Sequence, residues 1–196
     1  IKSGRFKGML RWTECAWNTV YGDDTGRAII STLLYMMYTG DTSRLGEIEE
    51  TLDFLISITG TDGLMKHGLY CINLSDEKME ELRSKPSNQY CAHRNAYYSA
   101  ALLLTYRLNH KKLYLDTAIK GLSTIMGVYP NTMRALSETE ELCRLVLPLA
   151  ALYTKSGYVE AWLVFFYLLL GLYLIMKRRH LAVFVLSAVL SLFLCL

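Results

Sequence analysis

Residues 89–108 read QYCAHRNAYYSAALLLTYRL. Alanine, tyrosine and leucine side chains occur around most of the circumference that this stretch has as a helix, so no wide polar face remains. The spacing predicts a helix over 89–108 that is covered on most of its sides. Such a helix needs several packing partners, and the stretches before and after it supply them.

The remaining apolar residues also recur with a helical period, while strand signals are nearly absent. Helices 24–39 and 137–154 are predicted to be broadly apolar, whereas helices 43–59 and 111–127 keep one charged side. A short helix is predicted around 76–84, and Gly40 is expected to end the first helix in the left-handed conformation. Broadly buried and one-sided helices therefore alternate along the chain. This alternation predicts an all-α fold of stacked αα-hairpins, either an open solenoid or a closed toroid with inner and outer helices.

The composition limits the classes of function. The chain has 196 residues and a formal net charge of +3, and its basic residues are interleaved with acids rather than gathered on one face. Nucleic acid is therefore not an expected partner. The five cysteines are odd in number and contain no CxxC pair, so we expect no disulfide framework, no metal site and no cofactor. Because the chain begins at Ile1 without a methionine or a signal peptide, we expect a fragment or a processed product.

Chemically active side chains gather where the broadly apolar helices begin. The three stretches are YGDDTGR at 21–27, NQYCAHRN at 88–95 and SETEELCR at 137–144. In stacked antiparallel hairpins the inner helices run in one direction, so their N-terminal ends should lie on the same side of the molecule. We therefore expect acids, histidine and arginine from three separate loops to meet in one pocket.

The adjacent aspartates of the first stretch, Asp23 and Asp24, can be interpreted in two ways. Asp24 can cap the first turn, because aspartate is a preferred N-cap residue. Asp23 is then available to bind or react, with Arg27 in the same turn. Trp17 and Tyr21 provide flat apolar surfaces nearby, and such surfaces pack on the C–H faces of sugar rings.

The other two ends divide in a similar way. Ser137 and Glu140 form the S-x-x-E capping box, which leaves Glu138 available to face the pocket as an anion favoured by the helix N-terminus. His93 and Arg94 lie in the first turn of helix 89–108, where a surface pair is the commoner reading and substrate binding the other. Asp62, His67 and Tyr70 belong to a glycine-rich loop that fits no phosphate-binding pattern, and they are expected on the rim of a cleft.

Three segments together resemble a known family. They are WTECAWNTVYGDDTGRAIISTLLYMMYTGD, NQYCAHRNAYYSAALLLTYRLN and SETEELCRLVLPLAALY, within residues 4–157. They are similar to the six-hairpin glycosidase-like proteins, which form an (α/α)6 toroid and act on glycans, often on oligosaccharides that contain uronic acid. The resemblance implies a partial toroid domain over residues 1–157, because this chain offers only about half of the hairpins.

The resemblance also implies roles for particular residues. Asp23, Asp24 and Glu138 would be the catalytic acids. The residues that would hold an oligosaccharide substrate are Trp17, Tyr21, Arg27, His93 and Arg94. Glycoside hydrolysis and lyase chemistry on unsaturated uronides would use overlapping sets of these groups. The Asp-Asp-Thr triplet also resembles the acid motif of class II terpene cyclases, but Tyr21 stands where that motif has a further acid.

The C-terminal segment departs from the helical alternation. Residues 158–176 and 181–196 are apolar, with one charge in the first and none in the second, and KRRH separates them at 177–180. We expect a hydrophobic helical hairpin over 158–196 that inserts in a membrane, since the first part is long enough to span a bilayer. Membrane association is the expected location in that case, and the cytoplasm otherwise. A buried hairpin in a larger assembly and an altered reading frame are the alternatives.

Two functions remain open from the sequence. One is a carbohydrate-active enzyme, with glycoside hydrolysis by carboxylate acid–base catalysis favoured. The other is a non-catalytic, membrane-anchored protein that binds glycans or acts as a scaffold.

Overall fold

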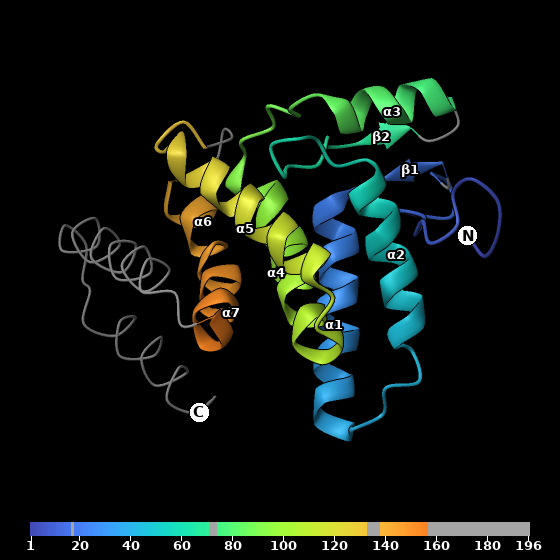
Figure 1. Cartoon of the computed structure of the whole chain (residues 1–196), viewed down its shortest axis with the longest axis horizontal. Coiled ribbons are helices and arrows are strands. Elements are labelled where there is room, and N and C mark those ends of the chain that lie inside the picture. The colour runs from blue at the N-terminus through green and yellow to red at the C-terminus, as the bar shows by residue number, and fades with distance from the viewer. Residues whose placement is uncertain (17, 71–73, 133–137, 157–196) are drawn as a thin grey trace.

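The computed structural model describes residues 1–16, 18–70, 74–132 and 138–156. This part of the chain is mostly helical, which confirms the predicted all-α class (Figure 1). The elements are β1 (Thr19–Val20), α1 (Gly22–Thr39), α2 (Leu45–Ser57), β2 (Leu69–Tyr70), α3 (Asp76–Ser84), α4 (Ala92–Asn109), α5 (Lys112–Gly127), α6 (Glu138–Cys143) and α7 (Val146–Ser156). The hairpin predicted over 158–196 lies outside the described residues.

Two tight connections produce antiparallel helix pairs. Gly40 ends α1 with φ 74°, and its N–H donates to the carbonyl of Met36 at 2.8 Å. His110 ends α4 in the same left-handed region, with φ 56° and an N–H bond to Tyr106 of 2.8 Å. The predicted role of Gly40 is confirmed, and α2 and α5 each return alongside the helix before them (Figure 1).

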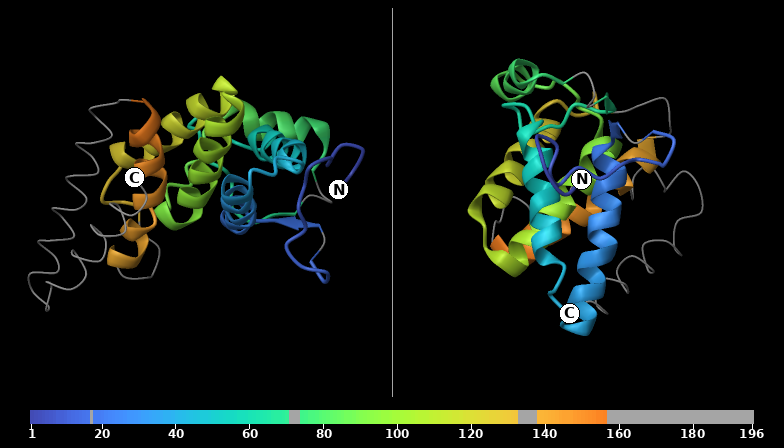
Figure 2. Two further views of the ribbon diagram at one scale, coloured as in Figure 1. Left: turned by 90° about the horizontal axis from the view of Figure 1, so that it is seen from below. Right: turned by 90° about the vertical axis from the view of Figure 1, so that its right-hand side faces the viewer.

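The broadly apolar helices share one direction. In Figures 1 and 2, α1, α4 and the α6–α7 segment run the same way, and α2 and α5 run back. Helix α4 lies between α1 and α7 and contacts both of them. This arrangement explains why α4 has so few polar positions, since neighbours cover it on several sides.

A glycine allows α1 and α4 to approach closely. A Cβ atom built on Gly26 would lie 2.7 Å from the carbonyl carbon and oxygen of Tyr97, and 2.9 Å from the backbone nitrogen of Tyr98. Real Cβ atoms do not come so near to backbone, so only glycine fits at this crossing. The position of Gly26, one turn after Asp23, brings the first turn of α1 close to α4.

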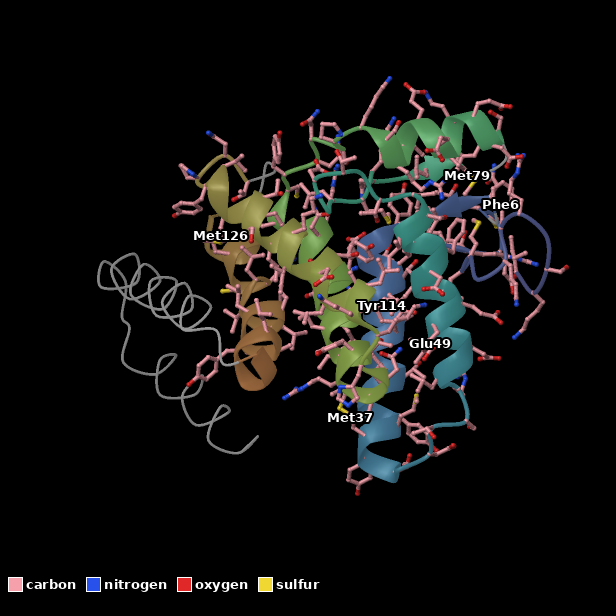
Figure 3. The ribbon with its side chains drawn as sticks, viewed as in Figure 1. Phe6, Met37, Glu49, Met79, Tyr114 and Met126 are labelled. Atoms are coloured by element: carbon pink, nitrogen blue, oxygen red, sulfur yellow. The ribbon has the colours of Figure 1, made fainter. Side chains whose placement is uncertain are left out.

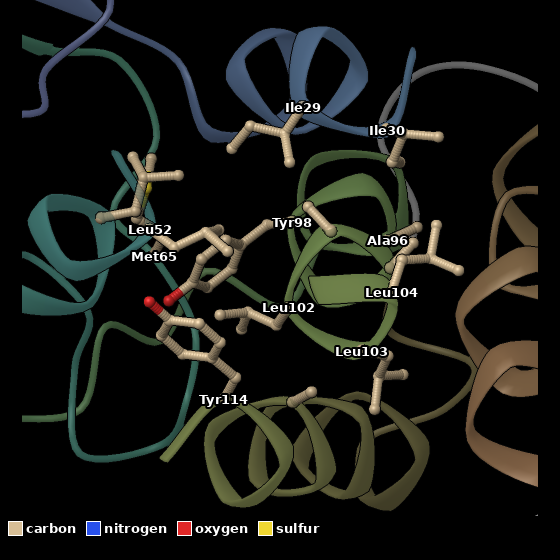
Figure 4. Close-up of a cluster of buried hydrophobic side chains, with 14 of the residues drawn as sticks. Ile29, Ile30, Leu52, Met65, Ala96, Tyr98, Leu102, Leu103, Leu104 and Tyr114 are labelled. Atoms are coloured by element: carbon tan, nitrogen blue, oxygen red, sulfur yellow. The ribbon is translucent and has the colours of Figure 1, made fainter. Parts of the chain in front are cut away.

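The core forms around α4 (Figure 4). Ile29 and Ile30 of α1 lie over Tyr98 and Ala96 of α4. The hydroxyl of Tyr98 lies 2.8 Å from Thr59 Oγ1, which itself donates to the carbonyl of Leu55. Tyr98 is therefore the donor in its own bond, so this deeply buried phenol keeps its proton and is satisfied.

A polar cluster joins α2 to α5 at the edge of the core. Lys111 Nζ lies 2.7 and 2.8 Å from the two carboxylate oxygens of Asp53, and the hydroxyl of Tyr114 donates to the same carboxylate at 2.9 Å. Figure 3 labels Tyr114 and Glu49 in this region, and the Tyr114 hydroxyl lies 3.3 Å from the Glu49 backbone carbonyl. These bonds hold α2 and the start of α5 together.

The helix predicted over 137–154 is interrupted. The described structure has α6 and α7 instead, with a turn at residues 144 and 145. Pro148 provides the reason, because it has no N–H to donate to the carbonyl of Arg144 and its ring crowds that carbonyl. The prediction of one continuous helix was therefore wrong in this respect.

A small antiparallel pair of strands holds the loop before α3 against the start of α1. Thr19 pairs with Tyr70, and Val20 pairs with Leu69. Each strand is only two residues long, which is below what periodicity detects. The pairing matters for the site because it brings His67 over Tyr21.

Of the helices in the described part of the chain, none combines the length and the apolar composition that a bilayer crossing requires.

Candidate functional site

Asp23 lies where the N-terminal ends of α1 and α4 approach each other. Its side chain projects from the first turn of α1, and the residue is only 5% exposed. The Oδ2 atom lies 3.3 Å from His93 Nε2 of α4 and 3.4 Å from Arg27 Nη2. The Oδ1 atom lies 3.9 Å from His67 Nδ1. Side chains from α1, α4 and the loop at 67 therefore converge on one carboxylate.

The surroundings of Asp23 supply a charged partner for its carboxylate but leave one of its oxygens without a hydrogen bond from the described residues. A buried carboxylate needs paired charges or hydrogen bonds, and Arg27 provides a cation one turn away. The positive end of the α1 dipole adds to this. Within the described residues, however, Oδ1 accepts no hydrogen bond. A ligand hydroxyl or a water molecule is the kind of donor that this oxygen lacks.

Asp24 has a different position from the one predicted. Helix α1 begins at Gly22, its N-cap is Tyr21, and no side chain caps it. Asp24 instead accepts a hydrogen bond from Trp12 Nε1 at 2.9 Å and forms an ion pair with Arg27. The predicted cap was wrong because Tyr21 follows strand β1 in extended conformation, and the helix starts directly after it. Both aspartates therefore lie inside the first turn.

Arg27 joins the two aspartates. Its guanidinium contacts both carboxylates, lies 3.4 Å from His93 Nε2, and stacks over the ring of Tyr97 with 4.6 Å to the centroid. A planar guanidinium suits several acceptors at once. Arg27, which was predicted to bind substrate, thus contacts both acids and His93.

Aromatic rings line one side of the aspartate pair. The ring of Tyr21 lies 4.9 Å from that of Trp12 and 4.7 Å from that of His67, centroid to centroid. Trp12 is half exposed, so one part of its indole is open to a ligand. The sequence analysis named Trp17 for this role, and Trp17 lies outside the described residues. Trp12 was not identified from the sequence, since its approach depends on the fold around Asp24.

In the described structure, the third acidic stretch contacts α4 through Glu141. Helix α6 begins at Glu138, but the side chain of Glu138 lies outside the described part of the structure, as does Ser137. The acid placed against α4 is Glu141, which is 0% exposed. Its Oε2 accepts a hydrogen bond from the backbone N–H of His93 at 3.0 Å. The apolar residues that follow Glu141 were the available signal that it faces inward.

Arg94 also lies in the first turn of α4. Its Nε atom is buried and has no hydrogen-bond partner among the described residues. His93 reaches Asp23 directly, whereas no contact between Arg94 and the aspartates is seen in the described structure. The structure thus brings together Asp23, Asp24, Arg27, His93 and Tyr21 of the predicted set.

A separate shallow groove lies between the N-terminal segment and α3. It is lined by Arg5, Asp76, Glu77, Met79, Glu80 and Arg83. Arg5 pairs with Asp76 at 2.8 Å, and Arg83 pairs with Glu80, so the charges of this groove largely satisfy one another. None of the residues around Asp23 lines it.

We find no metal site among the described residues: they contain no group of three or more histidine, cysteine or acidic side chains that could hold a metal ion.

Comparisons of the chain with protein-family models, with curated proteins and with solved structures give no match. The similarity to six-hairpin glycosidase-like proteins therefore remains a prediction from the quoted segments.

Proposed function

We propose that this chain is a carbohydrate-active protein of the six-hairpin type, and that it hydrolyses glycosidic bonds in oligosaccharides containing uronic acid. The observation that supports this most directly is the buried carboxylate of Asp23, flanked by Arg27, His67 and His93, with Oδ1 accepting no hydrogen bond from the described residues. The fold that accompanies the proposal is a partial (α/α)6 toroid over residues 1–157. Its membrane attachment through 158–196 is part of the proposal.

The chemistry assigns complementary roles to the acids. Glycoside hydrolysis needs one carboxyl group that protonates the leaving oxygen and another that activates water or attacks the sugar. Asp23 contacts the Arg27 guanidinium and lies in the first turn of α1, and we assign it the part of the base or the nucleophile. Asp24 or Glu138 then supplies the proton to the leaving oxygen.

The surroundings of the acids fit a sugar. The exposed part of Trp12 and the adjacent ring of Tyr21 offer an apolar surface to the C–H face of a pyranose ring. Arg27 and His93 lie within reach of the same space and are suited to a uronate carboxylate. An unsaturated uronide would contact the same groups, so hydratase-like addition of water to its carbon–carbon double bond belongs to the same proposal.

One observation favours a second candidate, a protein that binds glycans without turnover. Arg27 contacts both aspartates, so both carboxylates are already engaged by a side chain of the same helix. Under this candidate, Trp12 and Tyr21 still bind the sugar, and the aspartates accept its hydroxyl groups.

The test compares the wild-type chain with Asp23→Asn on a panel of uronide oligosaccharides. Turnover is followed by reducing-end release and, for unsaturated uronides, by loss of ultraviolet absorbance. We expect Asp23→Asn to lower kcat by about 10²–10⁴-fold, the range for losing a general acid or base. Asp24→Asn and Glu138→Gln identify the partner acid, and Asp116→Asn, at an exposed position of α5, is the matched control.

Calorimetric titration separates the two candidates. Glycan binding that survives Asp23→Asn, in a wild-type chain without turnover, supports the binding protein. Turnover that is equal in the wild type, Asp23→Asn and Asp116→Asn refutes the assignment of Asp23.

A further inference from the structure

The first turn of α4 is held by acceptors that come from much later in the chain. Its N-cap residue, Cys91, makes no side-chain capping bond. The N–H of Ala92 donates to the carbonyl of Thr132 at 2.9 Å, and the N–H of His93 donates to Glu141 Oε2 at 3.0 Å. Groups that a local cap usually satisfies are thus satisfied across the fold.

The carboxylate of Glu141 is fully buried and accepts a hydrogen bond there. It is 0% exposed, and transfer of a carboxylate from water is costly unless hydrogen bonds and favourable charges replace the water. The positive end of the α4 dipole and the His93 N–H supply these. The Cys91 thiol adds a weaker bond, with Sγ 3.7 Å from Oε2. An apolar side chain of similar size would avoid that cost, yet it would leave the His93 N–H without this acceptor.

The bond from Glu141 acts on the residue whose ring touches Asp23. His93 is held through its backbone by α6 on one side, and its Nε2 lies 3.3 Å from Asp23 and 3.4 Å from Arg27 on the other. The position of the ring depends on the position of the backbone that carries it. Glu141 therefore contacts His93, and His93 contacts Asp23. No contact between Glu141 and Asp23 themselves is seen in the described structure.

We propose that Glu141 is a positioning residue, which holds the backbone of His93 so that its imidazole ring lies against Asp23. This inference rests on the proposed function, because it assigns Glu141 a part in the same site. The group that matters is the acceptor oxygen rather than the negative charge. Glutamine, which keeps an acceptor oxygen in the same place, should therefore substitute for Glu141, and leucine should not.

The experiment compares Glu141→Gln and Glu141→Leu in the full chain, with Glu80→Leu on the exposed face of α3 as the control. For turnover of a uronide oligosaccharide, a misplacement of about 1 Å costs roughly 100-fold. We expect Glu141→Leu to lower kcat by about that factor with KM nearly unchanged. The kcat of Glu141→Gln should stay within about tenfold of the wild-type kcat. A neutral acceptor makes a hydrogen bond weaker than a carboxylate does by about 1.4 kcal/mol, which corresponds to one factor of ten in rate.

A second readout needs no substrate. In nuclear magnetic resonance spectra of the labelled chain, Glu141→Leu should shift the backbone and ring signals of His93 and speed the exchange of its amide proton at least tenfold. Glu141→Gln should preserve slow exchange. Unchanged His93 signals in a folded Glu141→Leu chain overturn the inference. If Glu141→Leu does not fold, fast exchange of the His93 amide in Glu141→Gln overturns it, and slow exchange supports it.

Glycan turnover and the His93 spectra test the two proposals independently. A wild-type chain that turns over no glycan refutes the proposed hydrolysis, while the His93 spectra still report whether Glu141 positions the ring. Loss of turnover in Glu141→Gln equal to that in Glu141→Leu, with both chains folded, overturns the role of the acceptor oxygen.

Discussion

Replacing Gly26 with alanine should loosen the crossing of α1 and α4. The added methyl carbon would lie 2.7 Å from the carbonyl carbon of Tyr97, whereas carbon atoms in contact lie about 3.5–4.0 Å apart. The shortfall is roughly 1 Å. Because the obstructing atoms belong to the backbone of α4, no change of rotamer relieves it, and the two helices must separate.

The expected loss of stability follows from two opposing terms. Overpacking of this kind costs about 1–3 kcal/mol, and contact with backbone places Gly26 at the upper end. The better helix propensity of alanine returns about 1 kcal/mol. We therefore expect Gly26→Ala to lower the free energy of unfolding by about 2 kcal/mol and, in a chain of this length, Tm by about 4–8 °C.

Gly46→Ala is the matched control. Gly46 lies in the first turn of α2 with no atom within 4 Å of the position of an added Cβ. The same substitution should therefore stabilise the chain, by about 0.5–1 kcal/mol. Urea unfolding followed by circular dichroism measures both. Equal midpoints for Gly26→Ala and the wild type would refute the close crossing, and with it the reason that Asp23 and His93 meet.

Two further predictions concern groups whose pKa the fold displaces. Burial raises the pKa of Tyr98 and Tyr114, with the Asp53 carboxylate adding to the effect at Tyr114, so both phenols should ionise only when the chain unfolds in alkali. The stability that they contribute is complete below the unfolded pKa of about 10 and is lost as the pH rises beyond it. A spectrophotometric titration of Tyr98→Phe and Tyr114→Phe should show the early ionisation step unchanged, and a smaller early step would contradict the burial. Burial likewise raises the pKa of the Cys143 thiol, while Cys15 is exposed, so brief alkylation at pH 8 followed by peptide mass spectrometry should find Cys15 modified first. Equal labelling of the two would count against the described packing of α6.

Much of the helical framework was predictable because it depends on local signals. The short helix predicted around 76–84 is confirmed as α3, whose N-cap Ser75 accepts a hydrogen bond from the N–H of Lys78. The left-handed end of α1 at Gly40 was likewise visible in the sequence. The break before α7 was also present there, in Pro148, but the apolar period across 137–154 masked it.

The location of the candidate site could be predicted from the sequence better than the residues that form it. The alternation of buried and one-sided helices predicted a common direction for α1 and α4, and with that direction Asp23 and His93 lie together. The contact of Trp12 with Asp24 and the approach of His67 depend on a strand pair too short to be recognised by period. Glu141 faces α4 in the described structure, one helical turn after the predicted Glu138, whose side chain lies outside that structure.

The central place of α4 has a consequence for synthesis on the ribosome. The apolar side of α1, with Ile29, Leu33 and Met36, is buried largely by a helix that begins some sixty residues later, at Ala92. Until α4 has left the exit tunnel, the apolar side of α1 in the nascent α1–α2 pair remains exposed to solvent. Chaperone binding to ribosome-bound chains should therefore be strongest at lengths that expose α1 and α2 but still enclose α4.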